Sequence, residues 1–331
     1  MHNTPLTRRT MLASAAACAF AATGAARAQD AFPSKPIRVV VPFAPGNTFD
    51  VALRQVSEEM VKAGGQPLVI DNKPGASGII AAQLVANAPP DGYTILLASL
   101  SHLAVNPYTF SKLPYDPEKS YRPITNLLGA TLIMVVNAQQ VPSTNYRDFV
   151  TWAKGQGNKV SYASFSAGNT SHFAGVILNK AAGLDMVHVP YNGTPPAVQS
   201  VLAGNTQVAF VPLPAAKQHI EAGKLRAIAT TGAAPPALMS SIPTFRSLGV
   251  PELEIYLWGA LLAPAGTPDD VMRTLNRQLV GAIRTQPVRD KFASMDFEPM
   301  PSTPDEFTAY LRKEQARWSE AVKLSGFKAS E

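Results

Sequence analysis

The sequence predicts an α/β protein built on a mostly parallel β-sheet flanked by helices. Two observations support this fold class: short apolar runs typical of buried strands, and stretches of helical periodicity that separate them. Strands that alternate with helices form parallel crossover units, because a parallel pair needs a long connection. Ligands of such sheets bind beyond the carboxyl ends of the strands, so we expect a site in the loops there.

The first part of this pattern lies between residues 37 and 97. Residues 37–41 are an apolar, β-branched run typical of a buried parallel strand, and residues 68–70 and 93–97 are the next two strand candidates. Apolar residues recur at helical spacing at 51–60 and 79–85. The order of these segments is strand, helix, strand, helix, strand.

A second α/β region begins near Leu127. The predicted strands are 132–136, 160–164, 186–189, 208–211 and 225–229, and the predicted helices lie around 149–153, 176–178 and 198–202. A polar loop rich in hydroxyl and amide groups, 165–172, forms a further strand–loop–helix junction in this region.

The C-terminal part is predicted to be helical and to close over the first region. Thr267 is the expected N-cap of one helix, with Pro268 at its first position and two acids behind it. Thr303 and Glu306 form a capping box before a second helix, which Gly326 is placed to end. We interpret the acids of these first turns as caps and assign them no functional role.

Residues 1–28 are predicted to be a cleaved export signal. Arg8 and Arg9 precede an uncharged run, and the cleavage site is expected near Ala28, after a small-x-small pattern. The pair of arginines fits a twin-arginine signal, and a Sec signal is the alternative. Cys18 suggests a lipoprotein site, but Ala15 stands where a larger aliphatic residue is usual, so we do not expect lipidation. No later run offers about 18 uninterrupted apolar residues, the length that spans a bilayer.

The composition of residues 29–331 excludes several functional classes. The only cysteine of the chain is Cys18, so cleavage leaves no disulfide, thiol nucleophile or cysteine metal site. Cleavage also removes three arginines from a formal net charge of +6. The remaining basic residues are scattered, which argues against nucleic-acid binding. The length fits one large domain or two ordinary ones.

Two glycine-bearing loops follow the first two predicted strands. The first, residues 42–50, contains Gly46, and the second, residues 71–78, contains Gly75 and Gly78. Each precedes a helix, whose first N–H groups have no partner within the helix and carry the positive end of its dipole. Because glycine lets a ligand approach the backbone closely, the two loops predict an anion site, such as one for a carboxylate.

The sequence shows no enzyme motif. The Gly-Lys-Ser/Thr ending of a P-loop, the G-x-G-x-x-G fingerprint and the G-x-S-x-G elbow are all absent. The histidines His102, His172, His188 and His219 lack metal-ligand spacing. His102 and His172 are candidate bases of a serine hydrolase, but hydrogen bonds to loop backbone are the favoured interpretation. We therefore expect no catalysis, no metal and no cofactor.

The chain resembles the Bug, or TctC-type, extracytoplasmic solute-binding proteins of tripartite tricarboxylate transporters over nearly all of residues 29–331. The motifs that carry the resemblance are Pro-Phe-Ala-Pro-Gly at 42–46, Asn-Lys-Pro-Gly-Ala-Ser-Gly at 72–78, Asp-Gly-Tyr-Thr at 91–94, Leu-Pro-Tyr-Asp-Pro at 113–117, His-Val-Pro-Tyr-Asn-Gly at 188–193, Ala-Gly-Lys-Leu-Arg at 222–226 and Leu-Ala-Pro-Ala-Gly-Thr-Pro at 262–268. Each motif is short, but their order and spacing together are specific.

The resemblance implies a type II periplasmic-binding-protein (Venus flytrap) fold with two α/β lobes. Residues 29–129 and 255–331 would form lobe 1, and residues 130–254 would form lobe 2. A small carboxylate would be captured between the lobes in the periplasm by a monomer. The protein would then deliver it to the membrane subunits of a tripartite tricarboxylate transporter.

The resemblance also implies a set of ligand-binding residues. From lobe 1 these are Phe43, Gly46, Asn47, Thr48, Asp50, Gly75, Ala76, Ser77, Ser99 and His102; from lobe 2 they are Ser164, Ser166, Gly168, Thr170, His172, Tyr191 and Val211. Three of them have a simpler interpretation: Asp50 as a cap of the first helix, Phe43 as core, and Tyr191 as a plug in the seam between the lobes.

Three positions depart from the family pattern. Asn47 replaces the second glycine of the first loop, and asparagine tolerates left-handed backbone better than most residues. Phe-Ser-Ala at 165–167 replaces a Ser-Gly-Asn-like stretch. Val211 replaces an acid that in some members meets a ligand ammonium. The third change disfavours an amino acid and favours a dicarboxylate or an aromatic carboxylate.

The predicted mechanism is closure of the two lobes about crossing segments near 127–130 and 252–256. Ligand contacts to both lobes would stabilise the closed form in proportion to its differential affinity. Two alternatives remain at this point: a ligand sensor for a signalling system, which would use the same clamp, and an exported hydrolase.

Overall fold

The computed structural model describes residues 32–43, 45–75, 78–236 and 238–328. The chain divides into Met1–Ser34 and one compact unit, Lys35–Glu331. The predicted export signal and its cleavage near Ala28 lie outside the described residues, as do two predicted site residues, Ala76 and Ser77.

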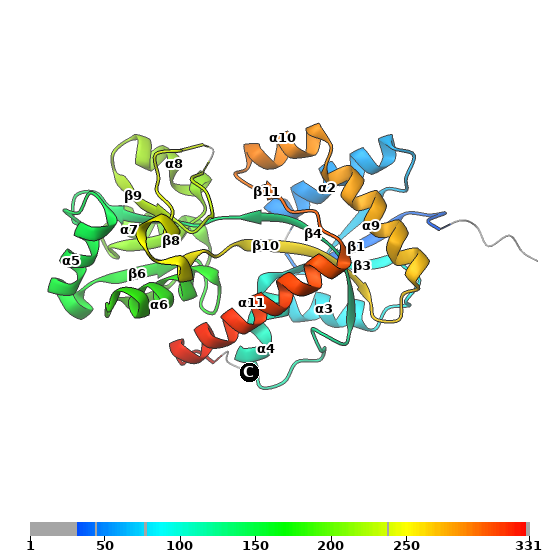
Figure 1. Cartoon of the computed structure of the whole chain (residues 1–331), viewed down its shortest axis with the longest axis horizontal. Helices are drawn as coiled ribbons and strands as arrows, with labels where there is room; N and C mark the ends of the chain where they lie inside the picture. Colours follow the sequence, from blue (N-terminus) through cyan, green and yellow to red (C-terminus); the bar gives the residue numbers. More distant parts are fainter. Residues whose placement is uncertain (1–31, 44, 76–77, 237, 329–331) are drawn as a thin grey trace, which may run out of the picture. The chain divides into compact units, whose positions relative to one another are not determined.

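The first sheet has the strand order β11-β4-β10-β3-β1-β2 (Figure 1). Its strands are β1 (Ile37–Val41), β2 (Leu68–Asn72), β3 (Thr94–Ser99), β4 (Tyr121–Ala130), β10 (Leu257–Pro264) and β11 (Glu298–Pro299). β1 pairs in parallel with β2 and β3, whereas β10 runs antiparallel to β3 and β4. The sheet is therefore mixed, with a parallel strand–helix–strand part and an antiparallel edge.

Helices from both ends of the chain accompany this sheet. They are α2 (Thr48–Lys62), α3 (Ile79–Ala86), a π-helical turn at Ser101–Val105 that leads into α4 (Asn106–Thr109), α9 (Asp269–Ile283), α10 (Gln286–Ser294) and α11 (Pro304–Ser325). The capping box of Thr303 and Glu306 is confirmed, as is Gly326 as a left-handed C-cap. The N-cap prediction for Thr267 is wrong: Pro268 is the N-cap of α9, and the Thr267 hydroxyl donates to the Pro264 carbonyl at 2.8 Å.

The second sheet has the order β7-β6-β8-β5-β9 and takes all its strands from the middle of the chain. Its strands are β5 (Ile133–Asn137), β6 (Ser161–Ser164), β7 (Val187–Pro190), β8 (Val208–Val211) and β9 (Leu225–Thr230), and its helices are α5 (Tyr146–Gln156), α6 (Thr170–Ala182), α7 (Thr194–Leu202) and α8 (Leu213–Glu221). β6 is parallel to β7 and β8, and β5 is antiparallel to β8 and β9. This sheet is mixed as well.

Two chain segments connect the sheets, after β4 and before β10. The strands end and begin side by side, since Ala130 pairs with Leu257. The buried Thr231 hydroxyl donates to the Ile255 carbonyl at 2.8 Å and accepts the Leu132 N–H at 2.9 Å. Residues 127–130, which we expected to cross between the lobes, are still part of β4, so the crossing comes directly after them. The division into two lobes that move relative to each other stays a prediction, because Lys35–Glu331 packs as one compact unit.

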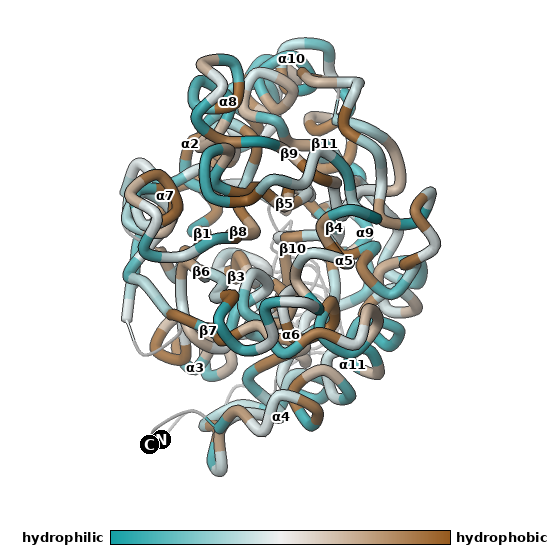
Figure 2. The backbone as a smooth tube through the Cα atoms, turned by 90° about the vertical axis from the view of Figure 1, so that its left-hand side faces the viewer, coloured by the Kyte–Doolittle hydropathy of each residue, from teal (hydrophilic) through white to brown (hydrophobic). Residues whose placement is uncertain are grey.

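The core lies along both sheets. β1, β5 and β8 are almost entirely buried, and Figure 2 shows central strands such as β8 and β10 as hydrophobic. The burial of their apolar side chains is the main force that stabilises the sheets. Among the described residues, no helix is both long enough and apolar enough for a membrane span.

Candidate functional site

A cavity of about 360 Å³ lies between the two sheets, at junctions where strands pass into helices. Its walls come from the loops after β1, β2 and β3 on one side and from the loop between β6 and α6 on the other, with the start of β10 between them. The predicted site residues that line it are Phe43, Gly75, Ser99, His102, Ser166, Gly168 and Thr170. The structure thus brings the loops after β1, β2 and β3 together with the 165–170 loop.

The other described site residues do not line this cavity: Gly46, Asn47, Thr48, Asp50, Ser164, His172, Tyr191 and Val211. Thr48 is the first residue of α2. Tyr191 donates to or accepts from Ser200 Oγ at 2.6 Å and packs against the core of the second sheet, which contains the fully buried Val211. Val211 is therefore a core residue of β8 in this structure.

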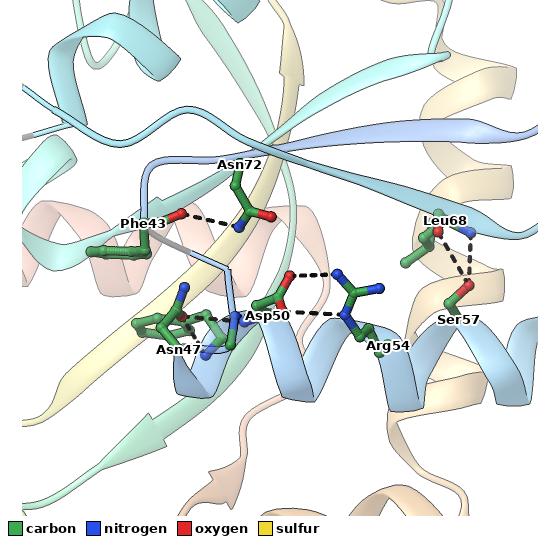
Figure 3. A network of polar contacts seen from close by, with 9 residues as sticks. Phe43, Asn47, Asp50, Arg54, Ser57, Leu68 and Asn72 are labelled. Atoms are coloured by element: carbon green, nitrogen blue, oxygen red, sulfur yellow. Dashed lines mark hydrogen bonds and ion pairs between the residues drawn. The ribbon is translucent and has the colours of Figure 1, made fainter.

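The first loop uses its own side chains to satisfy its backbone donors (Figure 3). Asn47 Oδ1 accepts the N–H groups of Phe49 at 2.9 Å and Asp50 at 3.2 Å, so Asn47 is the N-cap of α2. Its backbone is extended, with φ −68°, and the left-handed residue of the loop is Gly46 at φ +79°. The left-handed role that we considered for Asn47 is therefore wrong; asparagine is favoured here as a cap.

Asp50 completes this arrangement from the first turn of α2. Its carboxylate accepts the Gly46 N–H at 3.0 Å and is paired with Arg54 at 3.1 Å (Figure 3). Burial alone would raise the pKa of Asp50, but the hydrogen bonds from Arg54 and Gly46 hold the pKa below its usual value. The interpretation of Asp50 as a structural group of the loop is the one that its contacts support.

Phe43 belongs to an aromatic wall of the cavity. Asn72 Nδ2 donates to the Phe43 carbonyl at 3.0 Å and so holds the loop in place (Figure 3). The Phe43 ring stacks on Phe49 with 5.3 Å between centroids and meets the His102 ring edge-on at 6.1 Å. Both phenylalanines line the cavity, which gives it an apolar face.

His102 carries a buried donor in the cavity wall, next to Gly78. The backbone N–H of Ser99 donates to His102 Nδ1 at 2.9 Å, so this nitrogen carries no proton and the Ser99 hydroxyl at 2.8 Å donates to it as well. The ring proton of neutral His102 therefore lies on Nε2, which has no partner among the described residues. Burial lowers the pKa of His102 to about 4, so the ring is neutral at pH 7.

Gly78 lies directly against this nitrogen. A Cβ atom at residue 78 would overlap His102 Nε2, and the backbone has φ +80°, which favours glycine. Gly78 is also the N-cap of α3, where no described side chain caps the helix. The N-terminal end of α3 and His102 Nε2 are thus neighbouring donors at one side of the cavity.

The opposite wall is the loop between β6 and α6. Asn169 Oδ1 accepts the N–H groups of Ser171 at 2.9 Å and His172 at 3.2 Å, and His172 Nδ1 accepts the Gly168 N–H at 3.1 Å. His172 therefore stabilises this loop through the hydrogen bond from Gly168, and Ser164 stabilises it through the hydrogen bond to the Ser166 carbonyl. Burial lowers the pKa of His172 to about 3, with a contribution from the neighbouring His188.

Two serine–histidine contacts bear on the hydrolase alternative. In the first, the Ser99 hydroxyl donates to His102 Nδ1, but no described residue orients the ring from Nε2, as the third group of a catalytic triad would. Ser164 forms the second. Its hydroxyl donates to the Ser166 carbonyl at 3.0 Å, so it accepts the Nε2–H of His188 at 2.7 Å. Burial lowers the pKa of His188 to about 4, and its ring stacks on His172 at 3.8 Å. Because Ser164 is fully buried and His188 is the donor, this pair lacks the geometry of a nucleophile and its base.

Several lining residues were not predicted from the sequence. They are Pro42, Phe49, Gly78, Leu100, Ser101, Asn106, Phe165, Ala167, Asn169, Leu257 and Trp258. Gly78 and the 165–169 stretch lie within loops that the sequence did single out. Leu257 and Trp258 gave no signal, because they reach the cavity from a strand far along the chain. None of the described lining residues carries an Asp, Glu, Lys or Arg side chain.

A second cavity, of about 440 Å³, lies between α6 and α11, and none of the predicted site residues lines it. We take the smaller of these two cavities as the candidate site, because it joins loops from both sheets and is lined by seven of the predicted site residues, His102 among them. Among the described residues, no group of His, Cys, Asp or Glu side chains is placed to hold a metal ion.

Comparisons with known proteins agree with this architecture. A family model described as tripartite tricarboxylate transporter family receptor matches residues 52–327. Protein BugT of Bordetella pertussis is 30% identical over 300 residues, which cover 90% of this chain and 92% of BugT.

Solved structures are similar over the same extent. A structure described as a periplasmic transporter shares 38% identity with a TM-score of 0.76, over 90% of this chain and 99% of that one. An R. palustris protein solved with adipate shares 29% identity with a TM-score of 0.77, over 90% and 99% of the two chains. MatC of Rhodopseudomonas palustris, solved with bound malate, shares 28% identity with a TM-score of 0.72, over 88% and 100%.

These matches confirm the predicted fold, with two sheet-and-helix regions of the type II periplasmic-binding-protein class. The chain belongs to the tripartite tricarboxylate transporter receptor family and is one of its periplasmic solute-binding proteins.

Proposed function

We propose that this protein captures a dicarboxylate or an aromatic carboxylate in the cavity between the two sheets and delivers it to the membrane subunits of a tripartite tricarboxylate transporter. The observation that carries this proposal is the uncapped N-terminal end of α3 at one side of the cavity, where the buried Nε2–H of His102 lies against Gly78 without a described partner. A buried donor without an acceptor is costly, so we expect a ligand oxygen to approach it when a ligand binds at this end of the cavity.

The rest of the cavity supports a carboxylate bound by neutral groups. Its described lining offers hydroxyl, amide and backbone donors and no cationic side chain. The uncapped N-terminal end of α3 favours negative charge without a cation. In a cavity that excludes water, such fixed dipoles act more strongly than they would in solution.

The apolar wall supports a ligand with a hydrophobic body. Phe43, Phe49, Phe165 and Trp258 line the cavity together with Leu257. No described lining residue carries an acid, so the ammonium group of an amino acid would lose its hydration without gaining a partner. The adipate and malate of two similar proteins are dicarboxylates.

A thermal-shift screen followed by calorimetric titration tests this proposal. We expect dicarboxylates or aromatic acids to raise the melting temperature by mass action. Tight binding of glutamate or aspartate, with no binding of dicarboxylates and aromatic acids, would sink the proposal. Chemically altered ligand after incubation with pure protein would overturn the expectation that the protein is not an enzyme.

The remaining parts of the proposal concern the cell. The protein is proposed to be exported by the signal in residues 1–28, cleaved near Ala28, and to act as a monomer. N-terminal sequencing of periplasmic protein and light scattering of the purified chain test these two points. Loss of ligand uptake on deletion of this protein, with restoration by the intact chain, tests delivery to the transporter.

A further inference from the structure

A buried carboxylate on α11 joins two tryptophans that lie in different parts of the molecule. Glu314 is only 3% exposed, and its Oε2 atom accepts the Nε1–H of Trp258 at 3.1 Å and of Trp318 at 3.0 Å. Arg317 Nη1 lies 3.3 Å from Glu314 Oε1 and donates to the Glu254 carbonyl at 2.6 Å. The buried charge is therefore satisfied by three donors.

The first tryptophan lies at the wall of the cavity. Trp258, near the start of β10, is one of the lining residues, and its side chain is fully buried. Its ring packs edge-on against Phe307 at 5.8 Å and Tyr310 at 5.7 Å, both from the N-terminal half of α11. Glu314 fixes the one polar atom of this ring.

The second tryptophan lies at the contact between α11 and α6. The Trp318 ring meets Phe173 of α6 edge-on at 5.6 Å, and Lys180 of α6 pairs with Glu320 of α11 at 2.8 Å. Beyond the end of α11, the Phe327 ring lies against Gly168, on the 165–170 loop that forms the opposite wall of the cavity. Figure 1 shows α11 running beneath the long strands β4 and β10 towards α6.

We infer that Glu314 is a positioning residue that couples a ligand-induced shift of the cavity wall at Trp258 to the contact between α11 and α6. This inference rests on the proposed carboxylate site. If a ligand shifts the Trp258 ring, the ring must keep its hydrogen bond to Glu314 or leave a buried indole N–H and a buried carboxylate short of partners. Such an unmade bond to a charged group is costly in a low-dielectric interior, so Trp258, Glu314 and Trp318 move together.

The three tryptophans of the chain make this coupling measurable. Protein labelled with 5-fluorotryptophan should give three fluorine resonances, which the variants Trp152→Phe, Trp258→Phe and Trp318→Phe assign. Adipate is the first probe and benzoate the second. We expect both ligand-sensitive resonances, Trp258 and Trp318, to shift on titration, whereas Trp152, which packs on Phe149 within α5, serves as the internal control.

Two variants separate coupling from simple packing. Trp318→Phe keeps a ring against Phe173 but removes the hydrogen bond to Glu314, and we expect a roughly threefold to tenfold loss of ligand affinity although Trp318 does not line the cavity. Glu314→Met, which has a similar volume but removes the acceptor of both indole N–H groups, should abolish the ligand-induced shift of Trp318 while that of Trp258 remains. Trp152→Phe should change neither affinity nor the other resonances.

The outcomes distinguish this inference from the proposed function. The coupling alone would be overturned if the Trp258 resonance shifts while that of Trp318 stays fixed, or if the Trp318 shift is unchanged in Glu314→Met. If Glu314→Met does not fold, unchanged affinity in Trp318→Phe would overturn it. If neither Trp258 nor the melting temperature responds to any carboxylate, the proposed function fails and the coupling fails with it.

Discussion

Two neighbouring strand–helix junctions of the first sheet carry similar glycine signals in the sequence. They differ in whether described side chains accept hydrogen bonds from the donors of the junction. After β1, Asn47 and Asp50 accept the N–H groups of Gly46, Phe49 and Asp50 itself, so the loop satisfies itself. After β2 and β3, Gly78 leaves α3 without a described side-chain cap, and His102 Nε2 lies against Gly78 without a described partner. The first junction satisfies its own donors, and the second is the one that we propose binds the ligand.

The difference teaches that a helix N-terminus after a strand becomes a ligand site only when no side chain takes its donors first. Asparagine and aspartate in the first turn are strong caps, because their oxygens reach the N–H groups that the helix leaves unpaired. Glycine at the N-cap supplies no such oxygen. The residue that follows the glycine therefore decides whether the helix N-terminus is capped by the protein itself or can bind a ligand.

The largest effect is expected from a matched pair of glycine substitutions. Gly46 and Gly78 have similar backbone angles, φ +79° and +80°, but a Cβ at Gly46 meets nothing within 4 Å, whereas a Cβ at Gly78 overlaps His102. Both Gly→Ala variants should lose about 1–2 kcal/mol of stability from backbone strain. Only Gly78→Ala should also displace His102, and carboxylate binding should fall by at least about 100-fold.

Calorimetric titration and thermal melts of both variants check this pair. Retained affinity in Gly78→Ala would mean that the open junction does not hold the ligand. Lost affinity in Gly46→Ala would mean that the first loop contributes directly after all.

The next effect is expected from His102→Phe, which keeps a ring but removes the donor. A hydrogen bond to a charged group contributes about 1.5–3 kcal/mol, so the affinity for a carboxylate should fall by roughly 10- to 100-fold. His219→Phe on α8, which lies outside the cavity, is the matched control and should bind normally. Equal affinities of the two variants would contradict the donor role.

A smaller effect is expected from the two asparagine N-caps. Asn47 and Asn169 each accept two N–H groups in the first turn of a helix, but only Asn169 lines the cavity. Both Asn→Ala variants should lose about 1 kcal/mol of stability. Asn47→Ala should change affinity less than about threefold, whereas Asn169→Ala, which loosens the 165–170 loop, should weaken binding measurably. The reverse order of affinities would break the comparison.

The smallest expected effect on affinity is that of pH. Because the pKa of His102 lies at about 4, its ring stays neutral and affinity should be constant between about pH 6 and 9. Stability should behave differently. The pKa values of His102, His172 and His188 are lowered to about 4, 3 and 4, so the unfolded chain binds more protons below pH 6.5.

The contribution of these histidines to the free energy of unfolding is therefore fully present above pH 6.5, and it is lost as the pH falls through about 4. Asp296, whose pKa burial raises to about 6, acts in the opposite direction over part of this range. Three histidines outweigh one carboxyl group, so denaturant melts should show a net loss of stability on acidification. An affinity that changes strongly between pH 6 and 9 would contradict a neutral His102.

Much of the fold could be predicted because it follows from local periodicity. The strands 37–41 and 208–211 are predicted with their observed bounds, and the observed strands 68–72 and 94–99 differ from prediction by at most two residues at either end. The long strands β4 and β10 were missed. β4 mixes polar and apolar residues without strict alternation, and both its neighbours in the sheet come from the far end of the chain, so no local pattern marks it as a strand.

The candidate site was predictable in its location and only partly in its composition. The loops after the first strands were found from glycine and strand endings. Two features of the site depend on tertiary packing and leave no local signature in the sequence. Asn47 and Asp50 accept the N–H groups of one loop, and Trp258 of β10 lines the cavity. The lobe-closure mechanism and the roles of Ser164, His172, Tyr191 and Val211 as ligand contacts stay predictions.

The imidazole of His102 gives the most direct test of the central claim, that neutral donors of the second junction hold the carboxylate. Nitrogen-15 histidine NMR, with the His102 signals assigned by their absence in His102→Phe, reports both the tautomer and the hydrogen bond at Nε2. We predict a neutral ring protonated at Nε2, whose proton moves downfield when the tightest carboxylate of the screen binds. A ring protonated at Nδ1, or an Nε2 proton that a tightly bound carboxylate leaves unchanged, would contradict the account.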